Sequence, residues 1–392
     1  MPIFSCSCEV SKMSESFTAS EMYTWIEQGV PHLYLDVRNE ADFARFHVEG
    51  PQDIELLNIP YFDFLEQPEE SVAQLDASRS IRVICAKEGS AQFIADMLEE
   101  FGFADIQWLA KGIIAWGNVL VAKQVPTPDH YELWQFNRPG KASCAYGLIH
   151  GDELMLFDIS KNLDYYREFA LARNLSLVAV FETHLQADYI SGGPSLAAEF
   201  EVDYIAHEGD FGTSNVAYRG VVDGESIGFS KAGGPSVLCT HSPGHTPGST
   251  TYVIDDKYMI SGDTVFIVSV GRPDLGKKVV EWAKQLYATL KNRISVLPDD
   301  LMVLPSHYTD WGREANADHL IINDFGTVKT LNESIYALTS EDEFVSWVEA
   351  NMRPQPEEYI RIRKVNANIE TVDLATAEEL DLGKNQCAAS QG

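Results

Sequence analysis

The chain has 392 residues, of which 45% are hydrophobic and 22% are charged, a balance typical of globular domains with substantial cores. At roughly 100 to 200 residues per domain, this length predicts two or three domains and excludes a fibrous or disordered chain. The 59 acidic residues against 29 Lys and Arg give a formal net charge of -30. Because such a charge repels phosphate backbones and anionic membranes, we expect neither nucleic acid nor a membrane as a partner.

Cysteine usage and the N-terminus indicate a soluble cytoplasmic protein. The six cysteines are few for this length, and their spacing fits neither a disulfide framework nor a zinc ribbon. Cys6 and Cys8 form the one close pair, which is a weak metal-binding pattern. The first residues lack the basic start and apolar stretch of a secretory signal, and no run approaches the roughly 18 apolar residues of a membrane span.

The first elements along the chain predict a small α/β domain over residues 15–120. Residues 33–37 (LYLDV) and 81–85 (IRVIC) are short apolar runs typical of strands. Residues 19–28 and 90–101 have the apolar spacing of helices. Because strands alternate with helices, we expect a parallel sheet.

A linker is predicted at residues 121–130, where two prolines and several polar residues interrupt both periodicities. A second domain follows over residues 131–365. Residues 366–392 are expected to form a C-terminal tail whose last dozen residues are frayed.

The second domain begins with two predicted buried strands, at 153–159 and 176–184, on either side of a helix at 163–173. Four further apolar segments each end in Asp, His or turn residues: VLCTHS, STTYVID, YMISGD and LMVLPSH. Polar side chains at strand ends are how α/β folds commonly present a functional site.

Cys85 is the candidate nucleophile of the first domain. It closes a predicted strand just before a helix, where backbone N–H groups and the helix dipole lower a thiol pKa and bind anions. A buried core cysteine would occupy the same position, and the local sequence alone favours neither interpretation.

The surrounding residues resemble the rhodanese (sulfurtransferase) family over about a hundred residues. The resemblance is carried by LDVRNEADFARFHVEG, NIP, Cys85 and GFADIQWLAKGIIAWG. It implies that Cys85 carries sulfur as a persulfide and that Asp36, Arg38 and Trp116 support the loop.

The loop after Cys85 departs from that family. Where the family often has an arginine for the donor anion, this chain has Lys87 beside Glu88. This departure leaves the donor open and makes a dianion such as thiosulfate less natural than a persulfide.

The second domain carries a set of potential metal ligands at strand ends: His184, Asp188, His245, Asp263 and His307. Three imidazoles and two carboxylates brought together by a sheet edge could bind a transition metal.

This set resembles the metallo-β-lactamase superfamily, which implies an αββα sandwich. The first motif of that family usually reads H-x-H-x-D-H, but here it reads His184, Leu185, Gln186, Ala187, Asp188, Tyr189. Glutamine and tyrosine are poor substitutes for neutral imidazole as zinc ligands, so a two-zinc hydrolase of the glyoxalase II type is disfavoured.

The remaining two histidines and one carboxylate suit a non-heme Fe(II) with open coordination positions. The chain resembles the persulfide dioxygenases of that superfamily over about 130–365, through YELWQFNRPGKASCAYGLI, PGHTPGST, SGDTVF, VGRPDL and PQPEEYIRIRKVN. The resemblance implies that His184, His245 and Asp263 hold one Fe(II) per chain, with zinc as the alternative.

Four further residues receive roles from the same resemblance. Asp188 and His307 match second-metal positions and are expected either to orient ligands or to hold a second metal. Tyr189 is expected to fill the space that the missing imidazole vacates and to lie beside the substrate. Arg272 opens a stretch to Arg293 with six basic and two acidic residues, and we expect its guanidinium to hold a substrate carboxylate.

These features predict an enzyme of sulfur metabolism. It would oxidise a low-molecular-weight persulfide, with glutathione persulfide as the implied substrate, to sulfite with O2, coupled to sulfur transfer through Cys85. The alternatives are a zinc-dependent thioester hydrolase with a sulfurtransferase domain and a non-enzymatic persulfide sensor. The sequence leaves a homo-oligomer open.

Overall fold

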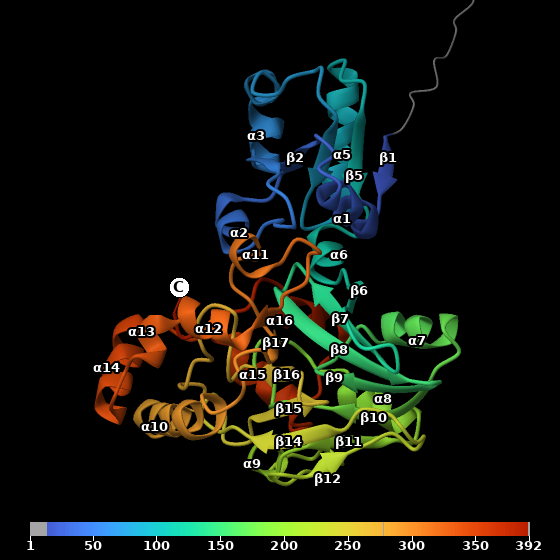
Figure 1. The fold of residues 1–392 in the computed structure, drawn as a ribbon. Coiled ribbons are helices and arrows are strands. Elements are labelled where there is room, and N and C mark those ends of the chain that lie inside the picture. Colours follow the sequence, from blue (N-terminus) through green and yellow to red (C-terminus); the bar gives the residue numbers. More distant parts are fainter. Residues whose placement is uncertain (1–13, 277, 391–392) are drawn as a thin grey trace, which may run out of the picture. The chain divides into compact units, whose positions relative to one another are not determined.

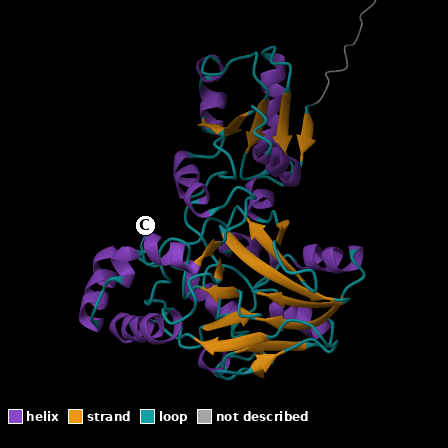
Figure 2. Ribbon diagram, viewed as in Figure 1, coloured by secondary structure: helices purple, strands orange, loops and turns teal. Residues whose placement is uncertain are grey.

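The computed structural model describes residues 14–276 and 278–390 (Figures 1 and 2). The chain divides into two compact units, Met1–Val119 and Leu120–Gly392, each with its own hydrophobic core. The division lies next to the predicted domain end at residue 120.

The first unit is the predicted parallel α/β domain. Its described residues form a five-stranded sheet in the order β1-β5-β4-β2-β3, in which every pairing is parallel. The strands are β1 (Glu15–Phe17), β2 (Leu33–Asp36), β3 (Glu55–Asn58), β4 (Ile81–Ile84) and β5 (Ile106–Leu109). The helices are α1 (Ala19–Glu27), α2 (Glu40–Arg45), α3 (Tyr61–Glu66), α4 (Pro68–Val72), α5 (Glu88–Glu100) and α6 (Ile113–Gly117).

The central strands of this sheet are buried on both faces, as expected where helices cover a parallel sheet. Every residue of β2 and β4 is buried. Helix α5 places Ala91, Ile94 and Leu98 in the same core, at the spacing of one helical face.

The second unit contains two mixed sheets. The seven-stranded sheet has the order β12-β11-β10-β9-β8-β7-β6, and the six-stranded sheet has the order β13-β14-β15-β16-β17-β18. Strands of the first are β6 (Val121–Val125), β7 (Glu132–Arg138), β8 (Ser143–His150), β9 (Glu153–Phe157), β10 (Ser176–Phe181), β11 (Asp203–Ala206) and β12 (Arg219–Gly220). Strands of the second are β13 (Ser226–Ile227), β14 (Val237–His241), β15 (Thr250–Ile254), β16 (Tyr258–Gly262), β17 (Met302–Pro305) and β18 (Asn323–Asp324).

Helices cover the outer faces of both sheets, so the predicted αββα sandwich is confirmed (Figure 1). Between the sheets, Phe157 stacks on Phe181 at a ring distance of 4.6 Å, and Phe181 meets Tyr252 at 5.2 Å. The helices are α7 (Leu163–Ala172), α8 (Gly193–Glu199), α9 (Glu208–Phe211), α10 (Val279–Thr289), the π-helical η1 (Leu290–Ile294), α11 (Trp311–Glu314), α12 (Phe325–Leu331), α13 (Glu333–Tyr336), α14 (Glu341–Asn351), α15 (Glu358–Asn366) and α16 (Leu374–Leu380).

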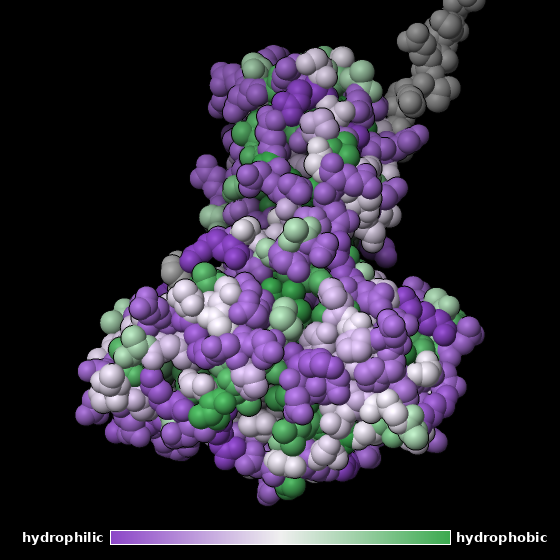
Figure 3. Space-filling view, in the orientation of Figure 1, coloured by the Kyte–Doolittle hydropathy of each residue, from purple (hydrophilic) through white to green (hydrophobic). Residues whose placement is uncertain are grey.

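The visible surface is mostly hydrophilic, with scattered apolar residues (Figure 3). Among the helices in the described ranges, none is both long enough and apolar enough to cross a bilayer.

The first half of the predicted linker at 121–130 is a strand. Val121–Val125 forms β6, which pairs antiparallel with β7 at the edge of the seven-stranded sheet. Val125 reaches the core between the sheets, so the segment contributes to packing. The prolines at 126 and 128 end the strand because they cannot donate to a ladder.

The predicted C-terminal tail at 366–392, with its last dozen residues expected to be frayed, is structured over its described residues. It contains α16, and the residues that we call the C-terminal segment (381–390) are packed against the second unit. Within it, Asp381 is buried and lies 2.8 Å from a guanidinium nitrogen of Arg138 and 2.7 Å from the ammonium of Lys161. This polar segment can be buried because its carboxylate is paired with cations and its other side chains are mostly small. The amino-acid composition alone does not reveal this pairing.

We predict that Asp381→Asn lowers the free energy of unfolding of the larger unit by about 3–5 kcal/mol, because it leaves buried cations without their counter-charge. Urea unfolding of the full chain, with hydrogen exchange assigning the transition to this unit, measures the change. Asp164→Asn is the control, since Asp164 pairs with Arg167 at the surface and should have little effect. Equal unfolding midpoints for the two variants would contradict the prediction.

Candidate metal centre

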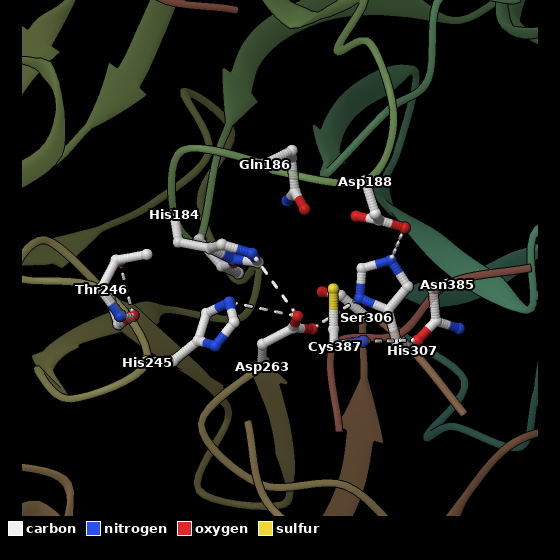
Figure 4. Close-up of polar contacts among 12 residues, drawn as sticks. His184, Gln186, Asp188, His245, Thr246, Asp263, Ser306, His307, Asn385 and Cys387 are labelled. Atoms are coloured by element: carbon white, nitrogen blue, oxygen red, sulfur yellow. Dashed lines mark hydrogen bonds and ion pairs between the residues drawn. The ribbon is translucent and has the colours of Figure 1, made fainter. Parts of the chain in front are cut away.

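The metal centre predicted from the sequence lies where several strands of the second unit end. His184 follows β10, Asp263 directly follows β16, and His307 lies two residues after β17. His245 lies in the loop between β14 and β15. Figure 4 shows the side chains of His184, His245 and Asp263 directed toward one another.

Gly262 makes this approach of loops feasible. Its φ of +56° is in the left-handed region, and a Cβ there would lie 2.6 Å from Oγ1 of Thr183. A larger residue would therefore separate the loop that carries His184 from the strand end that carries Asp263.

Three buried donor atoms converge at the centre. Nε2 of His245 and Nε2 of His184 lie 3.3 Å and 3.7 Å from Oδ2 of Asp263. One ligand atom from each residue lies within 4.8 Å of the others. All three atoms are buried and have no hydrogen-bond partner in the described part of the chain. Buried polar atoms normally have partners, so a cation fits this gap.

Hydrogen bonds fix which nitrogen of each imidazole faces the centre. Thr183 donates its hydroxyl hydrogen to Asp158 (2.7 Å) and therefore accepts from Nδ1 of His184 (2.9 Å). Nδ1 of His245 donates to the backbone carbonyl of Arg272 (2.9 Å). Both Nε2 atoms are thereby left with a free lone pair, which is the arrangement of ligating histidines.

The electrostatics keep these groups in the protonation states that metal binding requires. Burial lowers the pKa of His184 to about 4 and also lowers that of His245. Although burial raises the pKa of Asp263, the charges of His307 and His184 outweigh it and lower that pKa. At neutral pH the imidazoles of His184 and His245 are neutral and the carboxylate is ionised.

Asp188 and His307 form a second cluster beside the first. Nδ1 of His307 donates to Oδ1 of Asp263 (2.7 Å), and Nε2 of His307 lies 2.9 Å from Oδ2 of Asp188. Burial disfavours the His307 cation, but the charges of Asp188 and Asp263 raise its pKa to about 10.

Cys387 joins the second cluster, and the sequence analysis missed it. Its sulfur, a nitrogen of His307 and an oxygen of Asp188 all lie within 4.8 Å of one another (Figure 4). Burial and the neighbouring carboxylates raise the pKa of this thiol well above its usual range. No motif marks Cys387, because it lies in a short polar segment predicted to be a tail.

Gln186 and Tyr189, which replace the usual imidazoles, each donate one hydrogen bond to another protein group, while the carbonyl oxygen of Gln186 is buried without a hydrogen-bond partner among the described residues. The amide of Gln186 donates to Glu182 (3.1 Å), and the hydroxyl of Tyr189 donates to the carbonyl of Asp158 (2.9 Å). Tyr189 is buried with its ring 5.9 Å from that of His307. Its role in this structure is to fill the space beside His307 rather than to offer a free hydroxyl to a substrate.

Arg272 is likewise engaged within the protein. Its buried guanidinium makes a two-pronged contact with Asp274 (2.6 and 2.7 Å) and donates to the carbonyls of Gln386 and Arg353. The structure thus makes Arg272 an anchor of the C-terminal segment and does not present it to a substrate carboxylate.

The basic stretch that follows Arg272 is largely neutralised by acids elsewhere. Lys284 pairs with Glu341, and Arg293 pairs with Asp223. Lys277 of the same stretch is outside the described residues.

An open cavity of about 430 Å³ adjoins the loops that carry the metal-site histidines. Its wall includes Leu185, which follows His184, and Pro247. Arg363 and Lys364 of α15 also line it, together with the acidic Asp210, and Arg363 donates to the carbonyl of Leu275 (2.7 Å).

In the first unit, Cys85 lies between the end of β4 and the start of α5, as predicted, and is 7% exposed. The first turn of α5 has no side-chain cap. Arg38 binds the carboxylate of Asp36 through two nitrogens and donates to the carbonyl of Phe46, and Trp116 is fully buried. The Cys6 and Cys8 pair lies outside the described residues.

Comparison with known proteins identifies both units. Residues 18–118 match the Rhodanese-like domain family, and residues 139–307 match the Metallo-beta-lactamase superfamily. The chain therefore consists of a rhodanese-like domain followed by a metallo-beta-lactamase domain, as the sequence predicts.

Among its relatives, the chain is similar to mitochondrial persulfide dioxygenase ETHE1. Identity with the Homo sapiens protein is 28% over 42% of this chain and 64% of the relative, just under two thirds of its length. Identity with the Bos taurus protein is 26% over 55% of this chain and 80% of the relative. A hydroxyacylglutathione hydrolase of Polaromonas sp. is 30% identical over 37% of this chain and 54% of that protein.

Solved structures agree on the fold. A metallo-beta-lactamase from Staphylococcus aureus superposes with a TM-score of 0.55 at 23% identity, covering 61% of this chain and 73% of that chain. ETHE1 from Myxococcus xanthus gives a TM-score of 0.50 at 21% identity, covering 64% of this chain and all of that chain.

We predict that Thr183→Val weakens metal binding at the His184 site by roughly 10–100-fold, because the hydroxyl that orients the His184 ring is lost. Competition with a chromogenic chelator measures the affinity. Thr127→Val, which removes a hydroxyl bonded to the Tyr131 carbonyl, should leave the affinity unchanged. Unchanged affinity in Thr183→Val would show that the ring is held by other contacts.

Proposed function

We propose that this protein oxidises a low-molecular-weight persulfide with O2 at a single Fe(II) held by His184, His245 and Asp263, and transfers sulfane sulfur through Cys85. The overall oxidation is balanced as RSSH + O2 + H2O giving RSH, sulfite and two protons. The observation that carries the proposal is the convergence of two unpartnered Nε2 atoms and one carboxylate oxygen. Two histidines and one carboxylate with open positions suit Fe(II) oxygenase chemistry.

The donor set fits such an ion because its three atoms are buried, lack other partners and have the required protonation states. When bound, the ion would bring O2 and the terminal sulfur of the substrate together and accept and donate electrons during the oxidation.

The chain's own residues orient the ligands and hold the substrate. The Asp158–Thr183 pair fixes the His184 ring, and the carbonyl of Arg272 fixes the His245 ring. We infer that the thiol carrier binds in the cavity of about 430 Å³ with its carboxylates toward Arg363 and Lys364. Glutathione persulfide, with two carboxylates, has the matching charge.

The rival function is zinc-dependent thioester hydrolysis, favoured by the similarity to hydroxyacylglutathione hydrolase. Two-zinc hydrolases of this superfamily use the imidazoles that Gln186 and Tyr189 replace here. A neutral glutamine and a tyrosine whose hydroxyl donates to the Asp158 carbonyl are poor replacements for two imidazoles as zinc ligands.

In the rhodanese-like domain, the thiol of Cys85 would take sulfur from a persulfide in the exchange RSSH + Cys85–SH giving RSH + Cys85–SSH. Cys85–SSH could then pass sulfur to a thiol for oxidation, or to sulfite to give thiosulfate.

His245→Ala is expected to abolish O2 consumption with glutathione persulfide and to remove iron from the protein, since it deletes one of three ligands. An oxygen electrode and metal analysis measure both quantities. His130→Ala, at an exposed position, should retain activity and one iron per chain. Zinc in the purified protein, with thioester hydrolysis and no O2 uptake, would refute the dioxygenase proposal.

Cys85→Ser should abolish sulfur transfer between a persulfide donor and a thiol acceptor, while leaving O2 uptake on added glutathione persulfide unchanged. Transfer is followed by mass spectrometry of the acceptor. Cys239→Ala serves as the control, because this thiol is buried on β14 and should have no part in transfer. Retained transfer in Cys85→Ser would contradict the carrier role.

A further inference from the structure

Asp210, in the short helix α9, is hydrogen-bonded to both loops that carry the histidines of the metal centre. Its Oδ2 accepts from the backbone N–H of Leu185 (2.8 Å), the residue after His184. The same oxygen accepts from the hydroxyl of Thr246 (2.7 Å), the residue after His245. One carboxylate oxygen therefore joins the chain neighbours of two proposed ligands.

The two loops belong to different sheets. His184 follows β10 of the seven-stranded sheet, whereas His245 lies between β14 and β15 of the six-stranded sheet. The approach of the two imidazoles therefore depends on contacts between the sheets. The N–H of Thr250 donates to the carbonyl of Thr183 (2.8 Å), which is another such contact. Asp210 differs from it because its carboxylate binds the residue directly after each histidine.

The second oxygen of Asp210 fixes the same loop at a further point. Its Oδ1 accepts from the backbone N–H of Gly248 (2.7 Å). A Cβ at Gly248 would lie 2.5 Å from the backbone nitrogen of Asp210, and a Cβ at Gly209 would lie 2.8 Å from the carbonyl oxygen of Pro247. The helix and the loop can approach this closely because both positions are glycines.

The three donors require a carboxylate. Because a carboxylate has two acceptor oxygens and no hydrogen, it can accept from Leu185, Thr246 and Gly248 together. An amide of the same shape has one acceptor oxygen and an NH2 group, so at least one of the donors would lose its acceptor.

We propose that Asp210 is a positioning residue of the metal centre, which holds the His184 and His245 loops at the separation that one ion requires before that ion binds. Because Asp210 orders the loops in advance, metal binding does not have to order them. The proposal rests on the ligands of the proposed function and not on its reaction.

Cobalt binding tests this role without catalysis. The full-length protein is stripped of metal and titrated with Co²⁺ in the absence of O2, and the affinity and the visible absorption spectrum of the bound cobalt are recorded. Asp210→Asn should weaken binding by roughly 10–100-fold and change the spectrum, because the ligand geometry is altered. Asp324→Asn is the matched control and should behave as wild type, since Asp324 accepts two hydrogen bonds from Thr327 in α12.

Variants of Thr246 show whether Asp210 acts through this contact. Thr246→Val removes the hydroxyl and should weaken cobalt binding, whereas Thr246→Ser keeps a hydroxyl and should retain the affinity. Asp210→Asn should lower the affinity less in the Thr246→Val background than in the wild type, because the shared contact is already lost.

Urea unfolding of the metal-free variants separates positioning from a general loss of stability. The proposal is overturned by wild-type affinity in Asp210→Asn, or by weaker binding with an unchanged cobalt spectrum and a lower unfolding midpoint. It is also overturned if the wild type binds no Co²⁺. Only this last result refutes the ligands of the proposed function as well, and O2 uptake tests the reaction separately.

Discussion

The carboxylate of Asp263 connects the two clusters of buried polar side chains in the second unit. Its Oδ2 faces the imidazoles of His184 and His245, and its Oδ1 accepts from His307. Because all of these groups are buried, each charge needs a counter-charge or a hydrogen bond in place. The two clusters are therefore coupled: a change in protonation or occupancy at one alters the charge that Asp263 presents to the other.

The main chain of Arg272 provides a second connection between the cluster around His245 and the cluster around Cys387. Its carbonyl orients His245, and its amide binds the carbonyl of Cys387. Gly271 precedes it, and a Cβ there would lie 2.0 Å from the carbonyl oxygen of Asp263 and 2.8 Å from Nδ1 of His245. The backbone at Gly271 thus packs directly against Asp263 and His245. The guanidinium of Arg272 donates to the carbonyl of Gln386 and so stabilises the C-terminal segment.

The sequence could predict the parts of this structure that local patterns encode. Strands such as β4 and β16 are short apolar runs, and His184, His245 and Asp263 follow such runs in familiar motifs. The place of Cys387 depends instead on contacts with Lys141, Ala142 and Val270, which lie more than a hundred residues earlier. The polar and small residues of this segment predict an exposed tail. Their composition does not reveal that Asp381 pairs with the buried cations of Arg138 and Lys161.

The role of Arg272 could not be predicted for a related reason. Its motif places it beside the site, but whether a guanidinium is free depends on nearby acids and carbonyls. Asp274 and the carbonyl of Gln386 satisfy it here. Similarly, local sequence patterns do not predict β6, because this edge strand is stabilised by its pairing with β7 and by the burial of Val125 in the core of the second unit.

The distance along the chain between His307 and Cys387 sets the order in which the buried polar residues appear during synthesis. At roughly 5–20 residues per second, the ribosome adds Cys387 on the order of 10 s after His307. His184, His245 and Asp263 therefore all exist before the segment that covers their neighbours. The burial of this polar cluster is therefore completed only by the last residues that the structure describes.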